Sequence, residues 1–131
     1  MKRYLIVGNG IAGASAAEQI RRQDSDGEIQ VFTDEAYPLY YRPRLIEVLA
    51  GEIDVRGCVI RDEAWYRANR ISLHPSRPVR SIDPAALRLE TIDGVKHSYD
   101  VLLLANGASP FRPPIPGIDG EHVFTLRSAQ D

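Results

Sequence analysis

A cluster of glycines near the N-terminus has the spacing of a phosphate-binding turn. Gly8, Gly10 and Gly13 fit the pattern G-x-G-x-x-G, with Ile11 and Ala12 before the last glycine. Glycines at these positions permit a tight turn after a strand, let the backbone approach a pyrophosphate and allow close helix–strand packing. The free N–H groups at the start of that helix would then face the phosphates. The spacing predicts a dinucleotide-binding turn.

A carboxylate follows at the distance that such a site needs. Asp34 stands 21 residues after Gly13, directly past a second predicted strand, and Glu35 is its neighbour. A carboxylate there can accept hydrogen bonds from ribose hydroxyls and would repel a 2′-phosphate. We expect Asp34 to take this role, with Glu35 as the alternative. A glycine-rich turn without a ligand has the same motif, but a strand, a helix and an acidic residue in register favour dinucleotide binding.

The elements that must position these residues form a strand–helix–strand unit. Residues 3–7 are a short apolar run, typical of a parallel strand buried on both faces. Residues 12–23 carry alanines at helical spacing and end near two arginines, which complement the helix dipole. A turn at 24–27 leads to a second strand at 28–33. The unit has the usual size of a βαβ crossover.

The middle of the chain predicts shorter elements. Residues 37–44 are interrupted by two prolines, so we expect an extended segment that is not regular helix. Helices are predicted at 45–50 and at 62–69, the second with Asp62 as a possible N-cap, and a short strand at 71–73.

The pattern then changes to a β meander. Short strands are expected at 79–82, 87–92 and 95–99, with Asp93-Gly94 as a hairpin turn signal. The chain returns to a buried strand at 101–105, enters a proline-rich loop at 106–120, and could add a last strand at 123–126. The predicted fold class is α/β, a Rossmann-like parallel sheet with an inserted antiparallel β meander.

Length, charge and cysteine content narrow the class of protein. A chain of 131 residues suits one domain, and a net charge of −2 does not favour binding to nucleic acid or to an anionic membrane. No apolar run approaches the roughly 20 residues of a membrane span. The single cysteine, Cys58, fits a reducing cytoplasm and lies among apolar residues, so we interpret it as a small buried hydrophobe. His74, His97 and His122 are expected to be solvated, and no metal motif is present.

The chain resembles the pyridine nucleotide-disulfide oxidoreductase superfamily, especially its branch of NADH-dependent rubredoxin, ferredoxin and nitrite reductase flavoproteins. The likeness runs along nearly the whole chain. It rests on the glycine motif and on four further segments: 40–45 (YYRPRL), 102–110 (LLLANGASP), 115–117 (IPG) and 123–127 (VFTLR).

The resemblance implies that the cofactor is FAD. In the family, the arginine of the segment matching 40–45 lies near the pyrophosphate, so Arg42 is the matching residue and Pro43 would shape the backbone beside it. A guanidinium suits a diphosphate better than an ammonium group does, although a plain surface arginine is the alternative. The resemblance implies further cofactor contacts at Val79, beside the adenine, and at Ala105, Asn106, Gly107 and Arg127. Asn106 replaces the threonine that is usual at its position.

Two departures from the family bear on chemistry. The chain lacks the paired or single active cysteine that several members use, so disulfide-reductase chemistry is not expected. A lysine that often approaches the flavin ring in related electron-transfer proteins matches Glu47 here. We therefore name no catalytic residue.

The resemblance also implies a division of the chain. Residues 1–110 match the N-terminal part of an FAD-binding domain, and residues 111–131 match a linker that leads to an absent NAD-binding domain. NAD(P)H is implied for the full-length parent only, with a rubredoxin, ferredoxin or nitrite-reducing partner as acceptor. The alternatives are a non-catalytic adenine-dinucleotide-binding module or partner subunit, and an NAD-binding domain unrelated to flavin. An open sheet edge predicts self-association.

Overall fold

The computed structural model describes residues 1–131 and opens with the predicted strand–helix–strand unit. Strand β1 (Arg3–Val7) leads through the glycine turn into helix α1 (Ile11–Gln23), and the chain returns in strand β2 (Glu28–Phe32). The two strands pair in parallel, with Ile6 opposite Val31. The predicted crossover is confirmed.

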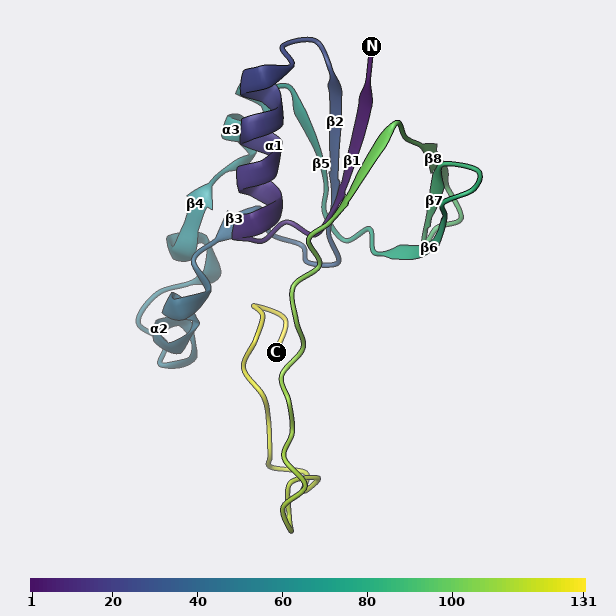
Figure 1. Ribbon diagram of the computed structural model, residues 1–131. Coiled ribbons are helices and arrows are strands. Elements are labelled where there is room, and N and C mark those ends of the chain that lie inside the picture. The colour runs from purple at the N-terminus through teal and green to yellow at the C-terminus, as the bar shows by residue number, and fades with distance from the viewer.

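The central sheet has four parallel strands (Figure 1). Strands β5 (Ile71–His74) and β9 (Val101–Leu104) join the first two in the order β5-β2-β1-β9. Because β1 is central, the turn that follows it emerges at the carboxyl edge between β2 and β9. That edge is where open α/β sheets bind their ligands.

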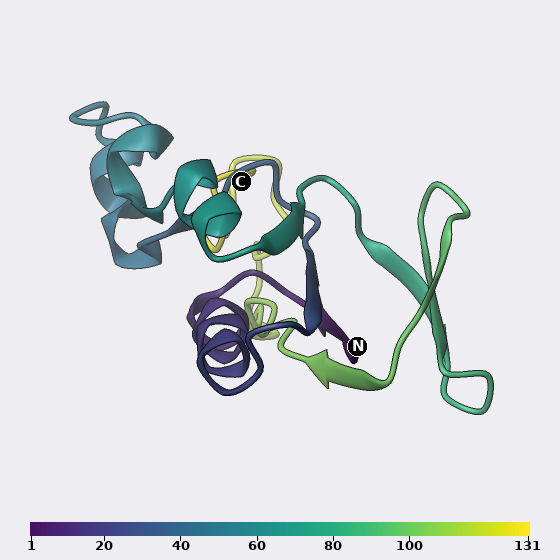
Figure 2. The same cartoon turned by 90° about the horizontal axis from the view of Figure 1, so that it is seen from above.

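Each face of the sheet is covered by a different layer (Figures 1 and 2). On one face α1 and α3 (Glu63–Ala68) enclose a core, in which Ile6, Ala17 and Tyr66 are buried. On the other face lies the meander, strands β6 (Val79–Asp83), β7 (Arg88–Thr91) and β8 (Lys96–Ser98) in an antiparallel sheet. Its core joins Leu5, Phe32, Leu89 and Tyr99. The predicted fold class is confirmed.

A small lobe lies beyond the sheet and differs in part from the sequence prediction. Strand β3 (Leu39–Tyr40) pairs antiparallel with β4 (Val59–Arg61), a strand that the sequence did not indicate. Between them lie a 3-10 turn η1 (Arg42–Arg44), helix α2 (Leu45–Leu49) and a second turn η2 (Val55–Cys58). The expectation of an extended segment through residue 44 is wrong after Tyr41, because Pro43 stands in the first turn of η1, where it loses no hydrogen bond.

Residues 106–126 form an irregular arm that projects from the body (Figure 1). The predicted strand at 123–126 is wrong, because this segment has no strand partner and Phe124 is 80% exposed. The end of the chain folds back toward the body, and Ala129 packs against the cluster of Tyr40 and Leu45. None of the helices has the length and apolar character that a membrane span requires.

Candidate functional site

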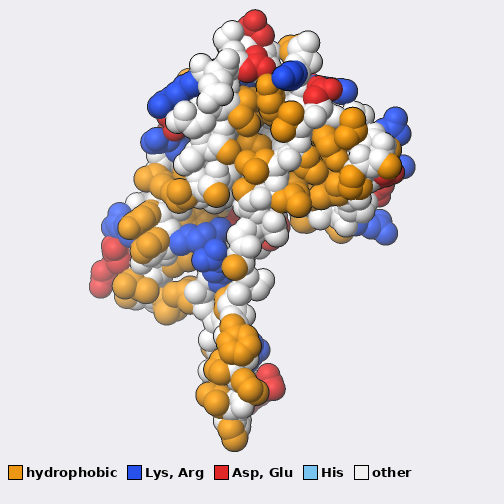
Figure 3. Space-filling model, viewed as in Figure 1, with side chains coloured by type: hydrophobic (Ala, Val, Ile, Leu, Met, Phe, Trp, Pro, Cys, Tyr) orange, Lys and Arg blue, Asp and Glu red, His pale blue; other side chains and the backbone are white.

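A cleft of about 870 Å³ opens at the carboxyl edge of the central sheet. Its size is within the roughly 300–1,000 Å³ of small-molecule and cofactor sites. Basic side chains gather where the arm leaves the body, beside this edge (Figure 3). Of the residues that the sequence singled out for cofactor binding, all but Gly13 line the cleft: Gly8, Gly10, Ile11, Ala12, Asp34, Glu35, Arg42, Pro43, Val79, Ala105, Asn106, Gly107 and Arg127.

The structure gives each of the three motif glycines a different role. Gly8 has φ of +107°, and an added Cβ would lie 2.1 Å from the carbonyl oxygen of Ala105. A Cβ at Gly13 would lie 2.0 Å from the carbonyl oxygen of Gly8, so this glycine serves packing and lies behind the cleft. A Cβ at Gly10 would meet nothing within 4 Å. The glycine turn therefore leaves open space at Gly10, where a ligand phosphate can approach the backbone.

The two candidate carboxylates have different surroundings. Asp34 is exposed at the rim of the cleft, whereas Glu35 is buried. The backbone N–H of Glu35 donates to the Thr33 hydroxyl at 3.2 Å, which holds the turn after β2. The Glu35 carboxylate accepts hydrogen bonds from Arg42 and from the Tyr40 hydroxyl. Both Glu35 oxygens therefore have protein partners, whereas the exposed Asp34 carboxylate is accessible from the cleft.

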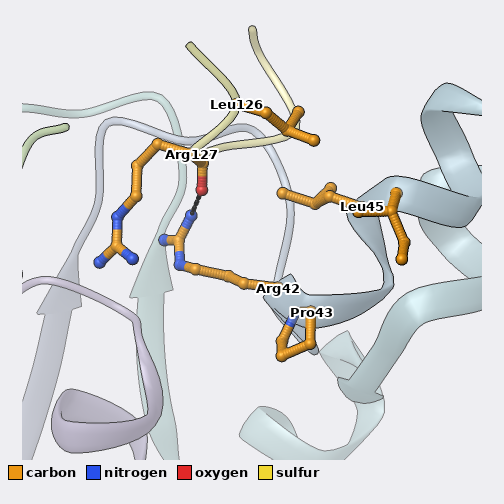
Figure 4. Close-up of a pocket in the computed structure, with 6 residues that line it drawn as sticks. Arg42, Pro43, Leu45, Leu126 and Arg127 are labelled. Carbon is orange, nitrogen blue, oxygen red and sulfur yellow. Dashed lines mark hydrogen bonds between the residues drawn. The ribbon is translucent and has the colours of Figure 1, made fainter. Parts of the chain in front are cut away.

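Arg42 is the centre of a hydrogen-bonded network. Its NH1 group donates to the Tyr40 hydroxyl at 2.8 Å and to the carbonyl oxygen of Arg127 at 2.9 Å, while NH2 pairs with Glu35. Figure 4 shows the Arg42 side chain reaching from η1 toward Arg127 on the returning chain. The guanidinium is thus fixed at the wall of the cleft by residues just before it in the chain and by Arg127, which is 85 residues further on.

Tyr40 carries the rest of this network. Its hydroxyl donates to Glu35 and accepts from the backbone N–H of Ala129 at 3.0 Å. Burial, together with the hydrogen bond to the Glu35 carboxylate, raises the pKa of Tyr40 to about 12. The phenol therefore stays protonated at neutral pH and acts as a donor that ties the end of the chain to the cleft.

Arg127 lies across the turn that follows β9. Its Nε donates to the carbonyl oxygen of Ala108 at 3.1 Å, and a Cβ at Gly107 would lie 3.3 Å from its NH2. Gly107 has φ of +68°, which also favours glycine there. The turn with Asn106 thus lines the cleft, and Arg127 adds positive charge to the lining.

A smaller hollow of about 370 Å³ adjoins the cleft beside α2. It shares Arg42, Pro43 and Arg127 with the cleft, and Leu45 and Leu126 close it on the other side (Figure 4). Its apolar walls suit a ring system more than a phosphate.

Near this hollow, Glu47 has a partner of its own. It binds Arg44 in an ion pair at 2.6 Å, and that hydrogen bond lowers the pKa of Glu47. The negative charge at the position matching the family lysine is therefore offset by Arg44. Cys58 is buried in the small lobe, as predicted.

The prediction of solvated histidines is correct for His122 and wrong for His74 and His97. His74 stacks on Phe32 with ring centroids 4.6 Å apart, and the His97 ring packs edge-on against Phe32 at 4.8 Å. Both histidines lie between the central sheet and the meander. They are half-buried because the two sheets pack together around Phe32, a tertiary contact that local sequence spacing does not indicate.

Sequence reasoning missed one pair of residues at the glycine turn. The Tyr66 hydroxyl donates to Oδ1 of Asn9 at 2.7 Å, which joins α3 to the turn. Asn9 lines the cleft and is buried, and its Nδ2 has no hydrogen-bond partner. No local signal could have found this pair, because the two residues are 57 positions apart.

Comparison with known proteins identifies a family whose model matches this chain. Residues 2–131 match the family model described as pyridine nucleotide-disulphide oxidoreductase. The NAD(P)H nitrite reductase of Bacillus subtilis is 36% identical over 99% of this chain and 16% of that protein. The rubredoxin-NAD(+) reductase of Ectopseudomonas oleovorans is 34% identical over 97% of this chain and 33% of that protein.

A solved structure agrees with these sequence relatives. The crystal structure of NADH:rubredoxin oxidoreductase from Clostridium acetobutylicum superposes with a TM-score of 0.85 and 32% identity, over 98% of this chain and 33% of that chain. The present chain thus spans about a third or less of the length of these relatives.

Proposed function

Because this chain belongs to the pyridine nucleotide-disulphide oxidoreductase family, we propose that it is the FAD-binding portion of a longer NAD(P)H-dependent flavoprotein oxidoreductase. Residues 1–110 are the N-terminal part of the FAD-binding domain, and residues 111–131 lead toward an NAD-binding domain in the parent protein. The observation that supports this most is the single cleft, which brings together the glycine turn, Asp34 and Arg42.

The residues of the cleft fit a flavin adenine dinucleotide. The open space at Gly10 and the first N–H groups of α1 suit the pyrophosphate, with Arg42 and Arg127 as cations nearby. Asp34 suits the adenosine ribose, and Val79 lies at the meander end of the cleft for the adenine. Bound flavin would supply the capacity to accept electrons from a nicotinamide and pass them on. The chain itself binds and orients the cofactor.

The acceptor is a small redox protein such as a rubredoxin or a ferredoxin. The names of two relatives, rubredoxin-NAD(+) reductase and NADH:rubredoxin oxidoreductase, support this class of partner, and the nitrite reductase supports a nitrite-reducing partner as the alternative. Residues 1–131 contain one G-x-G-x-x-G motif, which we assign to FAD, so we expect the FAD-loaded chain alone not to be reduced efficiently by NADH. The buried Cys58 favours a reducing compartment, the cytoplasm.

The first experiment is to mix the purified chain with FAD, remove free FAD by desalting, and record the visible spectrum. A retained flavin spectrum supports the proposal. A colourless protein that retains NAD in the parallel experiment would instead support an NAD-binding domain, and a chain that retains neither would contradict dinucleotide binding.

Gly10→Ala is the variant that localises the binding. A Cβ at Gly10 meets nothing within 4 Å, so the fold should keep its thermal midpoint, while the methyl group enters the approach to the backbone. We expect FAD binding to weaken at least about tenfold, the equivalent of about 1.4 kcal/mol. Gly57→Ala, whose Cβ would make an ordinary contact at 3.4 Å with Ile53, is the matched control. Equal FAD affinity in both variants would argue against the pyrophosphate at Gly10.

A further inference from the structure

One polar group of the Asn9 side-chain amide is hydrogen-bonded, and the other has no hydrogen-bond partner. Its carbonyl oxygen Oδ1 accepts from the Tyr66 hydroxyl at 2.7 Å, whereas its amide Nδ2 is buried without an acceptor. Only 9% of Asn9 is exposed, and it stands between Gly8 and Gly10 on the wall of the cleft. Buried donors without partners are uncommon in folded proteins, and each one destabilises the state that contains it.

The hydrogen bond from Tyr66 determines which polar group of the Asn9 amide lacks a partner. The tyrosine is buried in the same core as Ala17 of α1, and its protonated hydroxyl donates to Oδ1. Oδ1 therefore faces Tyr66, and Nδ2 is the opposite end of the planar amide group. Tyr66 thus orients Asn9 through a single hydrogen bond from α3.

An acceptor for Nδ2 would come with the ligand. The glycine turn and the start of α1 are built to receive an anion, and a phosphate oxygen is a strong acceptor. Nδ2 is covered by neighbouring atoms, so the amide must turn slightly toward the cleft to reach such an oxygen. Gly10 leaves that side open, since even a Cβ there would meet nothing within 4 Å.

We propose that Asn9 is a phosphate-binding residue, whose Nδ2 donates to the pyrophosphate of the bound dinucleotide, and that Tyr66 is the positioning residue that orients it. This inference rests on the proposed function, and it adds a side-chain contact to a turn that otherwise offers only backbone groups. It also makes α3 part of the cofactor site, although no residue of α3 lines the cleft.

The test compares FAD affinity with the stability of the FAD-free chain in four variants. Asn9→Ala removes the donor and should weaken FAD binding roughly 10- to 100-fold, the range for a hydrogen bond to a charged group. Asn9→Asp keeps the size and the acceptor for Tyr66 but places a negative charge beside the phosphates, so its affinity should be lower still. Tyr66→Phe keeps the amide and loses its orientation, so it should weaken binding less than Asn9→Ala does.

Tyr4→Phe is the matched control, because it also removes one tyrosine hydrogen bond, to Asp24 at 2.9 Å, and Tyr4 does not line the cleft. FAD affinity should be unchanged in this variant. The thermal midpoint of the FAD-free chain should fall in Asn9→Ala, because the buried Tyr66 hydroxyl loses its acceptor, and should partly recover in the double variant Asn9→Ala/Tyr66→Phe, which removes that donor as well. A purely structural role predicts the same fall in midpoint with normal FAD affinity.

Two further measurements separate binding from positioning. The ³¹P NMR signals of bound FAD should shift in Asn9→Ala and stay in place in Tyr4→Phe. In the double variant Asn9→Ala/Tyr66→Phe, FAD affinity should equal that of Asn9→Ala alone, because Tyr66 acts through Asn9. Additive losses would overturn the role of Tyr66.

The failure of this inference is distinguishable from that of the proposed function. If the wild-type chain binds FAD and Asn9→Ala binds it equally well, the role of Asn9 is wrong and FAD binding stands. If the wild-type chain does not bind FAD at all, the proposed function fails and the Asn9 inference fails with it.

Discussion

Among single residues, Arg42 shows how protein contacts fix a guanidinium at the wall of the cleft. Arg42 contacts Glu35, Tyr40 and the carbonyl oxygen of Arg127, so its position does not depend on a ligand. The Glu35 carboxylate offsets its charge, which limits the repulsion between Arg42 and Arg127. Glu35 is thus a support for Arg42 in this structure, which favours Asp34 over Glu35 for the proposed ribose contact.

The buried ion pair can be tested with Glu35→Gln. The Glu35 side chain is 11% exposed, and the Arg42 side chain is 30% exposed. Removing one partner of such a pair leaves a partly buried charge, so we expect the free energy of unfolding to fall by about 1–3 kcal/mol in urea denaturation. Glu47→Gln breaks the more exposed pair with Arg44 and should cost less stability than Glu35→Gln does. Equal losses would contradict a special role for Glu35.

The assignment of the ribose to Asp34 predicts a different phenotype. Asp34→Asn keeps the size of an exposed side chain, so the thermal midpoint should stay within roughly 1–2 °C of the wild type. FAD affinity should fall about 5- to 20-fold, because a charge-assisted hydrogen bond to a ribose hydroxyl becomes a neutral one. Asp26→Asn, in the exposed turn after α1, is the control. Unchanged FAD affinity in Asp34→Asn would mean that another residue contacts the ribose.

At the scale of elements, local sequence signals were reliable where an element is stabilised by its own residues. The helix predicted at 62–69 begins at its expected N-cap, since the Asp62 side chain accepts from the N–H of Trp65 at 2.9 Å. Gly94, with φ of +80°, makes the predicted hairpin turn. In contrast, β4 was missed and a strand at 123–126 was wrongly expected. Short strands depend on a partner from a distant part of the chain, which local pattern does not reveal.

The junction between the central sheet and the meander predicts a pH dependence. Burial lowers the pKa of His74, and the neighbouring His97 and Arg77 lower it further, while Asp93 acts in the opposite direction. The unfolded chain then binds more protons than the folded one as pH falls below about 6.5, so stability decreases with falling pH. We expect the thermal midpoint to drop by roughly 2–5 °C between pH 7.5 and 5.5 beyond what His74→Gln shows.

His122→Gln is the control for this measurement, because the His122 side chain is 90% exposed. It should keep the full pH dependence of the wild type. If His74→Gln and the wild type lose stability in parallel, the titration of another group explains the effect.

For the molecule as a whole, the exposed feature of the central sheet is its edge at β9. Strand β9 has a neighbour on one side only, and Val101, Leu103 and Leu104 are exposed on it. Further hydrophobic side chains, including Phe111 and Phe124, are exposed on the arm, and Figure 3 shows hydrophobic atoms over both regions. A parallel edge strand with apolar side chains invites pairing with another chain.

We therefore predict concentration-dependent self-association, measured by light scattering or sedimentation. Leu104→Lys should reduce it, because Leu104 is 58% exposed and a lysine on an edge strand opposes pairing. Ile92→Lys, at a similar 59% exposure in the meander, should leave it unchanged. A wild-type chain that stays monomeric at every concentration tested would contradict the prediction.

Sequence pattern alone was enough to predict the βαβ unit, the fold class and a set of residues that line the cleft, because glycine spacing, helical periodicity and the position of Asp34 are read from residues close together in the chain. Only the tertiary structure decided that Glu35 supports Arg42, that Tyr66 orients Asn9, and that His74 and His97 enclose Phe32. These contacts join residues from different elements. Their partners are chosen by how the layers pack, and burial then decides which polar groups are satisfied and which remain free for a ligand.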